Sequence, residues 1–180
     1  MSGVGHKAPL IFLVETIPTP IGPLVLTHDG KALWNIAFHD RAERRAAELA
    51  RHAPHAMLKS KRNRSIFATA LSAFFNGNLD AINKLPIAPL GTEFQRTAWK
   101  ELRRIPAGQT RSYGEQAARI GHEAAARAIG SANGQNPISI VVPCHRLIGA
   151  NGSLVHYGGG LDRKKWLIDH EACHVARRKK

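Results

Sequence analysis

Short runs of apolar residues in the first half of the chain predict strands. Apolar residues dominate at 11–14, 24–26 and 33–38, which is typical of buried strands. A segment rich in turn-forming residues, 18–23, separates the first two runs. Asp29-Gly30 indicates a tight hairpin between the second and the third. We therefore expect the chain to begin with three short strands.

Helical patterns follow these strands. A charged helix is predicted over 41–51 and a basic loop over 59–64, before a second helix that ends at Asn76-Gly77. The apolar face expected for this second helix consists of Ile66, Ala70, Leu71 and Phe74. The histidines of this half lack the spacing of metal ligands, so we expect them at the surface: His28, His39, His52 and His55.

The second half of the chain has a mainly helical pattern. Pro86 and Pro89 indicate a domain boundary near residue 90. Capping boxes at 92–95 and 112–115 predict two helices, the first running to about residue 104 and the second ending at Gly121. A third helix is predicted over 123–132. Two helices joined by a tight glycine turn are typical of a helix-turn-helix, although purely structural helix pairs share the pattern.

The second helix of that pair carries almost no bulky side chain. A helix that reads bases in the major groove normally carries several long polar side chains, whereas here Arg127 stands alone among alanines and glycine. Small residues allow the backbone to approach a narrow surface, which favours contact with a DNA minor groove. The alternative is a small-residue helix that packs against a neighbour and leaves Arg127 in solvent.

A second β-branched run, 138–142, ends at Pro143 and is followed by Cys144-His145-Arg146. The run predicts a buried strand, and proline prevents its continuation. The thiol would then sit on a rigid support where the chain leaves the core. Positive neighbours favour the thiolate, which is the nucleophilic form. We therefore expect a reactive cysteine, with a buried structural thiol as the alternative.

Composition and charge narrow the function. A hydrophobic content of 43% over 180 residues suffices for a core, and a net charge of +13 indicates a polyanionic partner, most often nucleic acid. Two cysteines are too few for a disulfide framework, and no Cys-x-x-Cys pair suggests zinc. Residues 1–9 lack a signal-peptide pattern and no apolar run is long enough to span a membrane, so we expect a reducing cytoplasmic location.

Taken together, these motifs resemble the O6-alkylguanine-DNA alkyltransferases, particularly the stand-alone bacterial type. The matching residues are Gly91-Thr92-Glu93-Phe94-Gln95-Arg96, Ile105-Pro106-Ala107-Gly108, Ser112-Tyr113-Gly114, Ala126-Arg127-Ala128-Ile129-Gly130, Asn136-Pro137, Val142-Pro143-Cys144-His145-Arg146, Tyr157, Gly159-Gly160, Arg163-Lys164 and His170-Glu171. The first half matches more loosely, through the turn at 19–23 and the strand pattern.

This resemblance implies an α+β protein. Residues 1–88 would form an RNase H-like α/β domain, and residues 89–174 a mainly helical domain that carries the helix-turn-helix and the alkyl-acceptor site. Residues 175–180 would form a disordered basic tail. The resemblance further implies a monomer without an obligate protein partner or membrane attachment, with cooperativity along DNA left open.

The resemblance also implies the chemistry. The alkyl group of O6-alkylguanine, and of O4-alkylthymine, in double-stranded DNA would pass irreversibly to Cys144, without a cofactor, so that each molecule reacts once. His145 would take the thiol proton through a water, and Glu171 would orient the imidazole. Asn136 would brace the turn that bears the cysteine. Tyr113 would donate a proton toward guanine N3.

The damaged base must leave the base stack before it can react. The resemblance implies that Arg127 enters the duplex and fills the space that this base leaves. The other residues expected at the DNA are Ala126, Ala128 and Gly130 in the minor groove and Ser112 and Arg96 at phosphates. The pocket residues expected are Tyr157, Gly158, Val155, Leu147 and Lys164. Because Val155 stands where some members have glycine, we expect a narrow pocket that disfavours bulky alkyl groups. The first half has no cysteine, so we expect no metal.

Three other functions compete with this interpretation. A non-catalytic alkyltransferase-like protein binds damaged DNA but lacks the cysteine, and Cys144 argues against it. A helix-turn-helix regulator would need a helix better suited to reading bases. A cysteine hydrolase usually has its cysteine and histidine far apart in the sequence. Cys173 has no role that the resemblance assigns.

Overall fold

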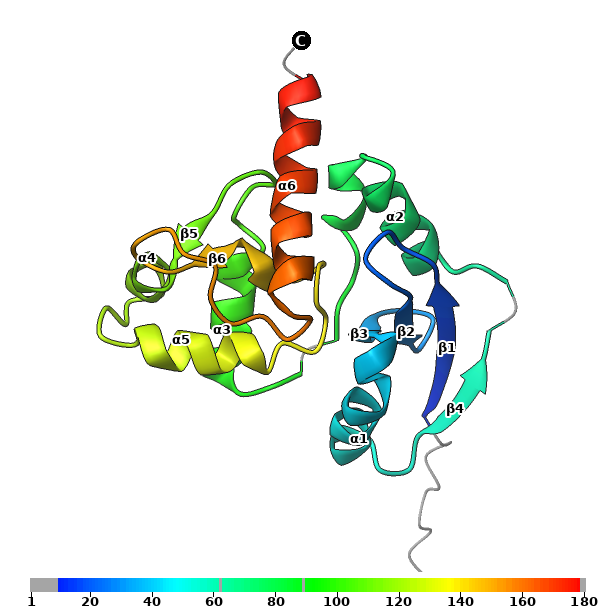
Figure 1. Ribbon diagram of the computed structural model, residues 1–180. Helices are drawn as coiled ribbons and strands as arrows, with labels where there is room; N and C mark the ends of the chain where they lie inside the picture. Colours follow the sequence, from blue (N-terminus) through cyan, green and yellow to red (C-terminus); the bar gives the residue numbers. More distant parts are fainter. Residues whose placement is uncertain (1–9, 62, 89, 179–180) are drawn as a thin grey trace, which may run out of the picture.

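The protein has an α+β architecture in which a sheet-containing N-terminal part and a helical C-terminal part lie on either side of α6 (Leu161–Arg178) (Figure 1). The structure is a computed structural model, and it describes residues 10–61, 63–88 and 90–178. Met1–Pro9, Arg62 of the expected basic loop, Pro89 of the expected domain boundary and Lys179-Lys180 of the expected tail lie outside the described residues.

The N-terminal sheet has the strand order β3-β2-β1-β4. The three predicted strands are present, and the hairpin at Asp29-Gly30 joins an antiparallel pair, whereas the fourth strand pairs parallel to β1 and was not predicted. Every residue of the fourth strand is exposed, so it lacks the apolar alternation by which a strand is found in a sequence. The strands are β1 (Ile11–Ile17), β2 (Leu24–His28), β3 (Leu33–Phe38) and β4 (Met57–Ser60).

Two helices accompany the sheet, and both were predicted within one residue at their starts: α1 (Ala42–His52) and α2 (Ile66–Phe75). The expected buried face of α2 is wrong at Ile66, which is 63% exposed. Ser65 caps the helix by accepting a hydrogen bond from Ala68 N. The helical period then places Phe67 against the core with Leu71 and Phe74, at positions i, i+4 and i+7.

His28 also differs from expectation, because it is buried rather than on the surface. Its side chain is 1% exposed, and its Nε2 lies 3.3 Å from Glu15 Oε1. Gly30 N donates to His28 Nδ1 at 3.0 Å, so the imidazole fixes the turn between β2 and β3. His39 and His55 are exposed as expected, and the side chain of His52 is not among those described.

The C-terminal part contains the predicted helix pair. Both capping boxes are formed, at the starts of α3 (Glu93–Leu102) and α4 (Tyr113–Arg119). The turn at Gly121 leads to α5 (Ala126–Gly134), which packs against α4 and α3. The predicted start at 123 is wrong by three residues. No side chain caps this alanine-rich helix, and residues 123–124 form a turn before it.

The run at 138–142 is a buried turn and not the predicted strand. Val142 N donates to Ile138 O at 2.9 Å, which folds the run back on itself, and Ile140 has φ 76°. Ile138, Ile140 and Val142 are all at most 2% exposed. The β-branched pattern therefore reflects burial from all sides, which a strand and a compact turn can share. The chain continues into a 3₁₀ turn (Cys144–Arg146) and β6 (Leu147–Ile148), which pairs with β5 (Arg111–Ser112).

The last helix ties the two parts together. Trp166 and His170 of α6 stack at 4.7 Å, and His170 Nε2 lies 2.9 Å from Phe74 O of α2. The helix runs to Arg178, so residues 175–178 are helical and the expected disorder is wrong for them. Buried residues of both halves form one hydrophobic cluster, so the C-terminal half packs directly on the sheet half.

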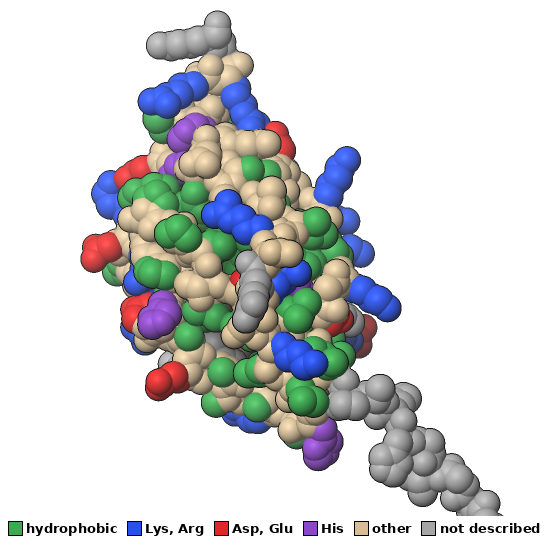
Figure 2. All heavy atoms as spheres, turned by 90° about the vertical axis from the view of Figure 1, so that its right-hand side faces the viewer, with side chains coloured by type: hydrophobic (Ala, Val, Ile, Leu, Met, Phe, Trp, Pro, Cys, Tyr) green, Lys and Arg blue, Asp and Glu red, His purple; other side chains and the backbone are tan. Residues whose placement is uncertain are grey.

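The surface gives two further observations. Figure 2 shows Lys and Arg side chains spread over the side of the molecule that bears the sheet edge rather than gathered in one patch. Among the described residues, no helix combines the length and the apolar character that crossing a membrane requires.

Two glycines with positive φ provide a stability test of the junction between α2 and α6. A Cβ at Gly77 would overlap the His174 ring, whereas a Cβ at Gly30 would meet nothing within 4 Å. In both alanine variants, the new residue must adopt the left-handed backbone conformation of the glycine, which costs about 1–2 kcal/mol. We expect Gly77→Ala to lower the free energy of unfolding by about 1 kcal/mol or more beyond Gly30→Ala, since His174 must move. Equal losses in urea denaturation would contradict this packing.

Candidate active site

Two asparagine side chains hold the backbone around Cys144. Asn136 Nδ2 donates to Val142 O at 2.9 Å, and its Oδ1 accepts from Ile138 N at 3.0 Å, so the expected brace is present. Asn133 Nδ2 donates to Cys144 O at 3.2 Å from α5. Cys144 is 4% exposed, and both cysteines of the chain are thiols. Cys173 is exposed on the outer part of α6.

His145 meets Glu171, the pairing that the family resemblance implied. His145 Nε2 lies 2.9 Å from Glu171 Oε1, which comes from α6, and the imidazole is fully buried. His145 Nδ1 makes no hydrogen bond to another described residue. Nε2 is therefore assigned as the protonated nitrogen that donates to the carboxylate, which leaves Nδ1 as the basic site.

Burial lowers the pKa of His145, with Arg146 and Lys164 acting in the same direction and Glu171 opposing them. The imidazole is therefore neutral at neutral pH. A neutral imidazole with one free lone pair can accept a proton from a thiol directly or through one water.

Arg146 is a site residue that sequence reasoning missed. Its Nε donates to Glu171 Oε2 at 3.0 Å, its Nη2 donates to Oε1 at 2.8 Å, and its Nη1 donates to Ile105 O at 2.5 Å. Gly108 N adds a hydrogen bond to Glu171 Oε2 at 3.1 Å. The sequence suggested only a positive neighbour for the thiol. A signal was available in the sequence: Arg146 follows an apolar run that predicts burial, and a buried arginine needs a carboxylate partner, which Glu171 provides.

The carboxylate of Glu171 stays ionised under these contacts. Burial by itself would raise its pKa, but His145 and Arg146 outweigh burial and lower the pKa to about 2. Glu171 is therefore negatively charged at neutral pH, and both Arg146 and His145 bond to its carboxylate.

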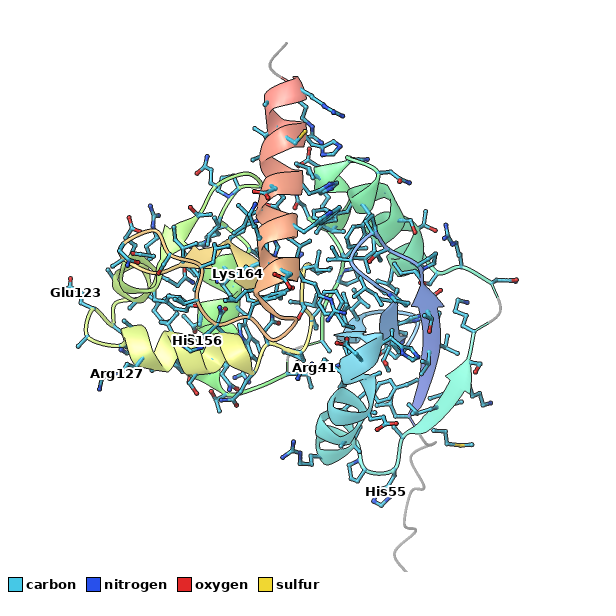
Figure 3. All side chains as sticks on the ribbon, in the orientation of Figure 1. Arg41, His55, Glu123, Arg127, His156 and Lys164 are labelled. Atoms are coloured by element: carbon cyan, nitrogen blue, oxygen red, sulfur yellow. The ribbon has the colours of Figure 1, made fainter. Side chains whose placement is uncertain are left out.

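Lys164 lies behind the site rather than in an open pocket. Its side chain is fully buried, and its Nζ donates to Leu147 O at 2.5 Å and to Val155 O at 2.6 Å. Burial lowers its pKa to about 8, and Cys144 acts in the opposite direction. Leu147 is likewise fully buried, so it supports the site from within the core. Figure 3 shows Lys164 near the start of α6.

The other expected pocket residues belong to one segment before α6. Val155 is partly buried and Gly158 is exposed. The Tyr157 ring lies 6.5 Å from the His145 ring and also 6.5 Å from the Phe38 ring, so it bridges the active site and the sheet half.

Tyr113 begins α4 on the opposite side of the site. Its hydroxyl is buried without a hydrogen bond to another described residue, and Asn133 Oδ1 is in the same situation. Burial raises the pKa of Tyr113, Cys144 raises it further, and the nearby Asn133 side chain opposes both. Tyr113 therefore keeps its proton at neutral pH, and it lies within electrostatic reach of the thiol.

The residues expected at DNA lie mainly on α5. Arg127 is exposed and projects outward from the start of this helix (Figure 3). Ala128 is exposed, and Ala126 and Gly130 are partly buried. Ser112 Oγ and one Arg96 nitrogen already make local hydrogen bonds, to Glu115 N at 3.1 Å and Gly91 O at 2.6 Å.

Two cavities lie apart from Cys144. One, of about 810 Å³, lies between the sheet half and the start of α3, and the other, of about 320 Å³, lies under α1. The described residues contain no group of three or more histidine, cysteine, aspartate or glutamate side chains placed to hold a metal ion.

Comparisons with known proteins agree with this geometry over almost the whole chain. Residues 13–89 match the family model of the 6-O-methylguanine DNA methyltransferase ribonuclease-like domain, and residues 93–173 match the model of its DNA binding domain. The chain belongs to the methylated-DNA–protein-cysteine methyltransferases. The expected resemblance, the α+β fold with a ribonuclease-like N-terminal half, and the repair of O6-methylguanine in DNA are thereby confirmed.

Individual relatives support the assignment. The methylated-DNA–protein-cysteine methyltransferase of Shigella flexneri is 46% identical over 165 residues, covering 90% of this chain and 96% of the relative. That of Methanosarcina mazei is 44% identical, covering 86% and 94%. The Mycobacterium tuberculosis methyltransferase, whose crystal structure was solved in complex with DNA, is 40% identical with a TM-score of 0.74, covering 91% of this chain and 94% of that one.

The shared carboxylate of this methyltransferase leads to a pH prediction. Because Arg146 contributes to the lowered pKa of His145, Arg146→Met should raise that pKa. The imidazole then becomes protonated, and useless as a base, at a higher pH. We expect the acid limb of the methyl-transfer rate to move to higher pH in Arg146→Met, by about half a pH unit or more.

The measurement is the single-turnover rate on an O6-methylguanine duplex at a series of pH values. Arg146→Lys is the matched control, because it keeps a positive charge beside Glu171 and should stay nearer the original profile. An Arg146→Met protein that folds, reacts and shows an unmoved acid limb would contradict the proposed coupling.

Proposed function

We propose that Cys144 accepts the alkyl group and that His145 and Glu171 activate it. The observation that carries this proposal is the buried, neutral imidazole next in sequence to the thiol, with its second nitrogen held by an ionised carboxylate at 2.9 Å. A cysteine thiol has a pKa near 8.5 in water, so a base is needed at neutral pH. In the reaction, the thiol proton moves toward His145 Nδ1 through a water, and a sulfur–carbon bond forms as the carbon–O6 bond breaks.

The guanine leaves with the electron pair of that broken bond, so it must gain a proton. Tyr113 is the proposed donor, toward guanine N3, because its hydroxyl is buried, keeps its proton at neutral pH and lies within electrostatic reach of Cys144. The product on the protein is a thioether. The proposed site needs neither a cofactor nor a metal and places no group to cleave the thioether, so each molecule reacts once.

We also propose that α5 lies along the minor groove of double-stranded DNA. Arg127 projects from the start of this helix, and its neighbours are small enough for close backbone approach. The complex of the Mycobacterium tuberculosis relative with DNA supports a DNA partner. Arg127 would fill the space of the extruded nucleotide. Ala126, Ala128 and Gly130 would face the groove, and Ser112 and Arg96 would face phosphates, partly through backbone N–H groups.

The finer substrate range follows from the pocket segment. Tyr157 would wall the alkyl group, with Val155 and Gly158 beside it, and Leu147 and Lys164 would hold this segment from behind. We propose that the pocket admits small O6-alkyl groups, and the small alkyl group of O4-alkylthymine, in preference to benzyl. We further propose a cytoplasmic monomer that needs no protein partner.

Intact-mass analysis tests the acceptor. After mixing with an O6-methylguanine duplex, the protein should gain one methyl group on the peptide that contains Cys144. Cys144→Ala should gain none, whereas Cys173→Ala should react as the unchanged protein does. Methylation at Cys173, or multiple turnovers with excess lesion, would overturn the proposal.

A second test addresses Arg127. Arg127→Ala should slow transfer from duplex DNA by about tenfold or more, because extruding a base costs a few kcal/mol that the side chain no longer offsets. Transfer from the free O6-methylguanine base should change little. Arg177→Ala, which removes an equal charge from the far end of α6, serves as the control. Equal rates for Arg127→Ala and the control on duplex DNA would contradict the assigned role.

A further inference from the structure

The cavity of about 810 Å³ has a lining that the methyl-transfer reaction does not use. It lies between β3 and α1 of the sheet half and the start of α3 and end of α5 of the helical half. A hydrogen bond from Ile36 N to Pro137 O, 2.9 Å long, joins the two halves beside it. Its lining residues are Trp34, Asn35, Leu49, Arg51, Leu90, Gly91, Thr92, Gln95, Trp99, Gln135 and Pro137.

The lining combines three chemistries. Trp34 and Trp99 provide indole rings, Asn35, Gln95 and Gln135 provide carboxamides, and Arg51 provides an exposed guanidinium. None of the described lining residues is acidic. Flat rings, hydrogen-bonding edges and a cation together suit a nucleotide, which has a π-face, polar base edges and a phosphate. The carboxamides of Gln95 and Gln135 bond to each other and to Thr92 N and Ser131 Oγ, and each keeps a second N–H that a base edge can meet.

Neighbouring contacts support part of this lining. The Phe12 ring packs against the Trp34 ring at 5.0 Å and so restricts its orientation. Gln95 Nε2 donates to Gln135 Oε1 at 2.9 Å, which links α3 to the residue after α5. Gly91 has φ +84°, and a Cβ there would come 2.8 Å from the Trp99 ring, so only glycine lets the linker pass this close to the indole.

The position of the cavity relative to α5 indicates that the nucleotide would belong to the DNA strand beside the lesion. Arg127 lies at the start of α5, and Gln135 follows its last residue, so the helix leads from the proposed lesion site to the cavity. Figure 1 shows the C-terminal end of α5 directed toward the sheet half. Eight residues of helix span about 12 Å, which is about three or four nucleotides of one strand.

We propose that this cavity binds single-stranded DNA flanking the lesion. The partly exposed Trp34 indole stacks on a base three or four nucleotides away, with the buried Trp99 supporting the cavity floor, and Arg51 contacts a phosphate. The cavity volume falls within the range of sites that hold one small ligand, so it takes a strand and not a duplex. This inference rests on the proposed function, because it places the lesion at Cys144. It gives the sheet half a DNA contact of its own.

Binding to matched oligonucleotides tests the proposal. The probes are a blunt O6-methylguanine duplex and the same duplex carrying a single-stranded extension, of either polarity, that begins within four nucleotides of the lesion. Affinity is measured by fluorescence anisotropy with Cys144→Ala, which prevents reaction. We expect an extension of one polarity to tighten binding by about fivefold or more, the effect of stacking one base.

Two variants locate the effect. Trp34→Leu and Arg51→Gln should each remove most of the gain, and Arg51→Gln should reduce the slope of log affinity against log salt by about 0.7 on the extended probe. Arg64→Gln, which removes an exposed charge before α2, should keep the gain. With Cys144 intact, all three should methylate from the blunt duplex at rates within about twofold of the unchanged protein, since none touches the site.

The outcomes separate the two proposals. No gain with either polarity, or a gain that survives both variants, would overturn the cavity assignment. If Trp34→Leu fails to fold, the exposed Arg51 decides the question. Methylation of Cys144 from the blunt duplex without any effect of the extension defeats this inference alone. Absence of methylation from every probe defeats the proposed function.

Discussion

The carboxylate of Glu171 is the group on which the rest of the site depends. It is 1% exposed and accepts hydrogen bonds from Arg146, from Gly108 N and, in the assigned tautomer, from His145. These contacts join the cysteine turn, α6 and the loop after α3. Removing one partner of such a buried cluster costs about 3–5 kcal/mol, because the remaining charges lose their counter-ion. The same contact that holds the domain together therefore keeps His145 in one tautomer, beside the thiol.

A compact turn, packed in the core, fixes the position of the Cys144 thiol. The β-branched residues at 138–142 fill the core, Asn136 ties the two ends of the turn, and the chain emerges with Cys144 in a fixed orientation. The sheet half contributes to this support, since Ile36 N bonds to Pro137 O and the Phe38 ring contacts the Tyr157 ring. Rigid support of this kind reduces the reorganisation needed when the alkyl carbon arrives.

Local signals in the sequence predicted local structure well. The capping boxes at Thr92 and Ser112 and the hairpin at Asp29-Gly30 depend on a few adjacent residues, and all three are present. The run at 138–142 was misassigned because burial on all sides produces the same apolar pattern in a strand and in a turn. β4 was missed because its residues are exposed, and His28 was misplaced because its partner Glu15 lies on another strand. The contact between Arg146 and Glu171 spans 25 residues, which no periodicity encodes. The pairing of His145 with Glu171 was predicted only through the family resemblance.

The protonation state of His145 tests the central claim most directly. Nitrogen-15 chemical shifts of the imidazole, measured at neutral pH in the unreacted protein and assigned with a His145→Gln variant, distinguish the two neutral tautomers and the imidazolium. We expect a neutral ring protonated at Nε2, with Nδ1 able to accept a proton. An imidazolium at neutral pH, or a neutral ring protonated at Nδ1, would contradict it.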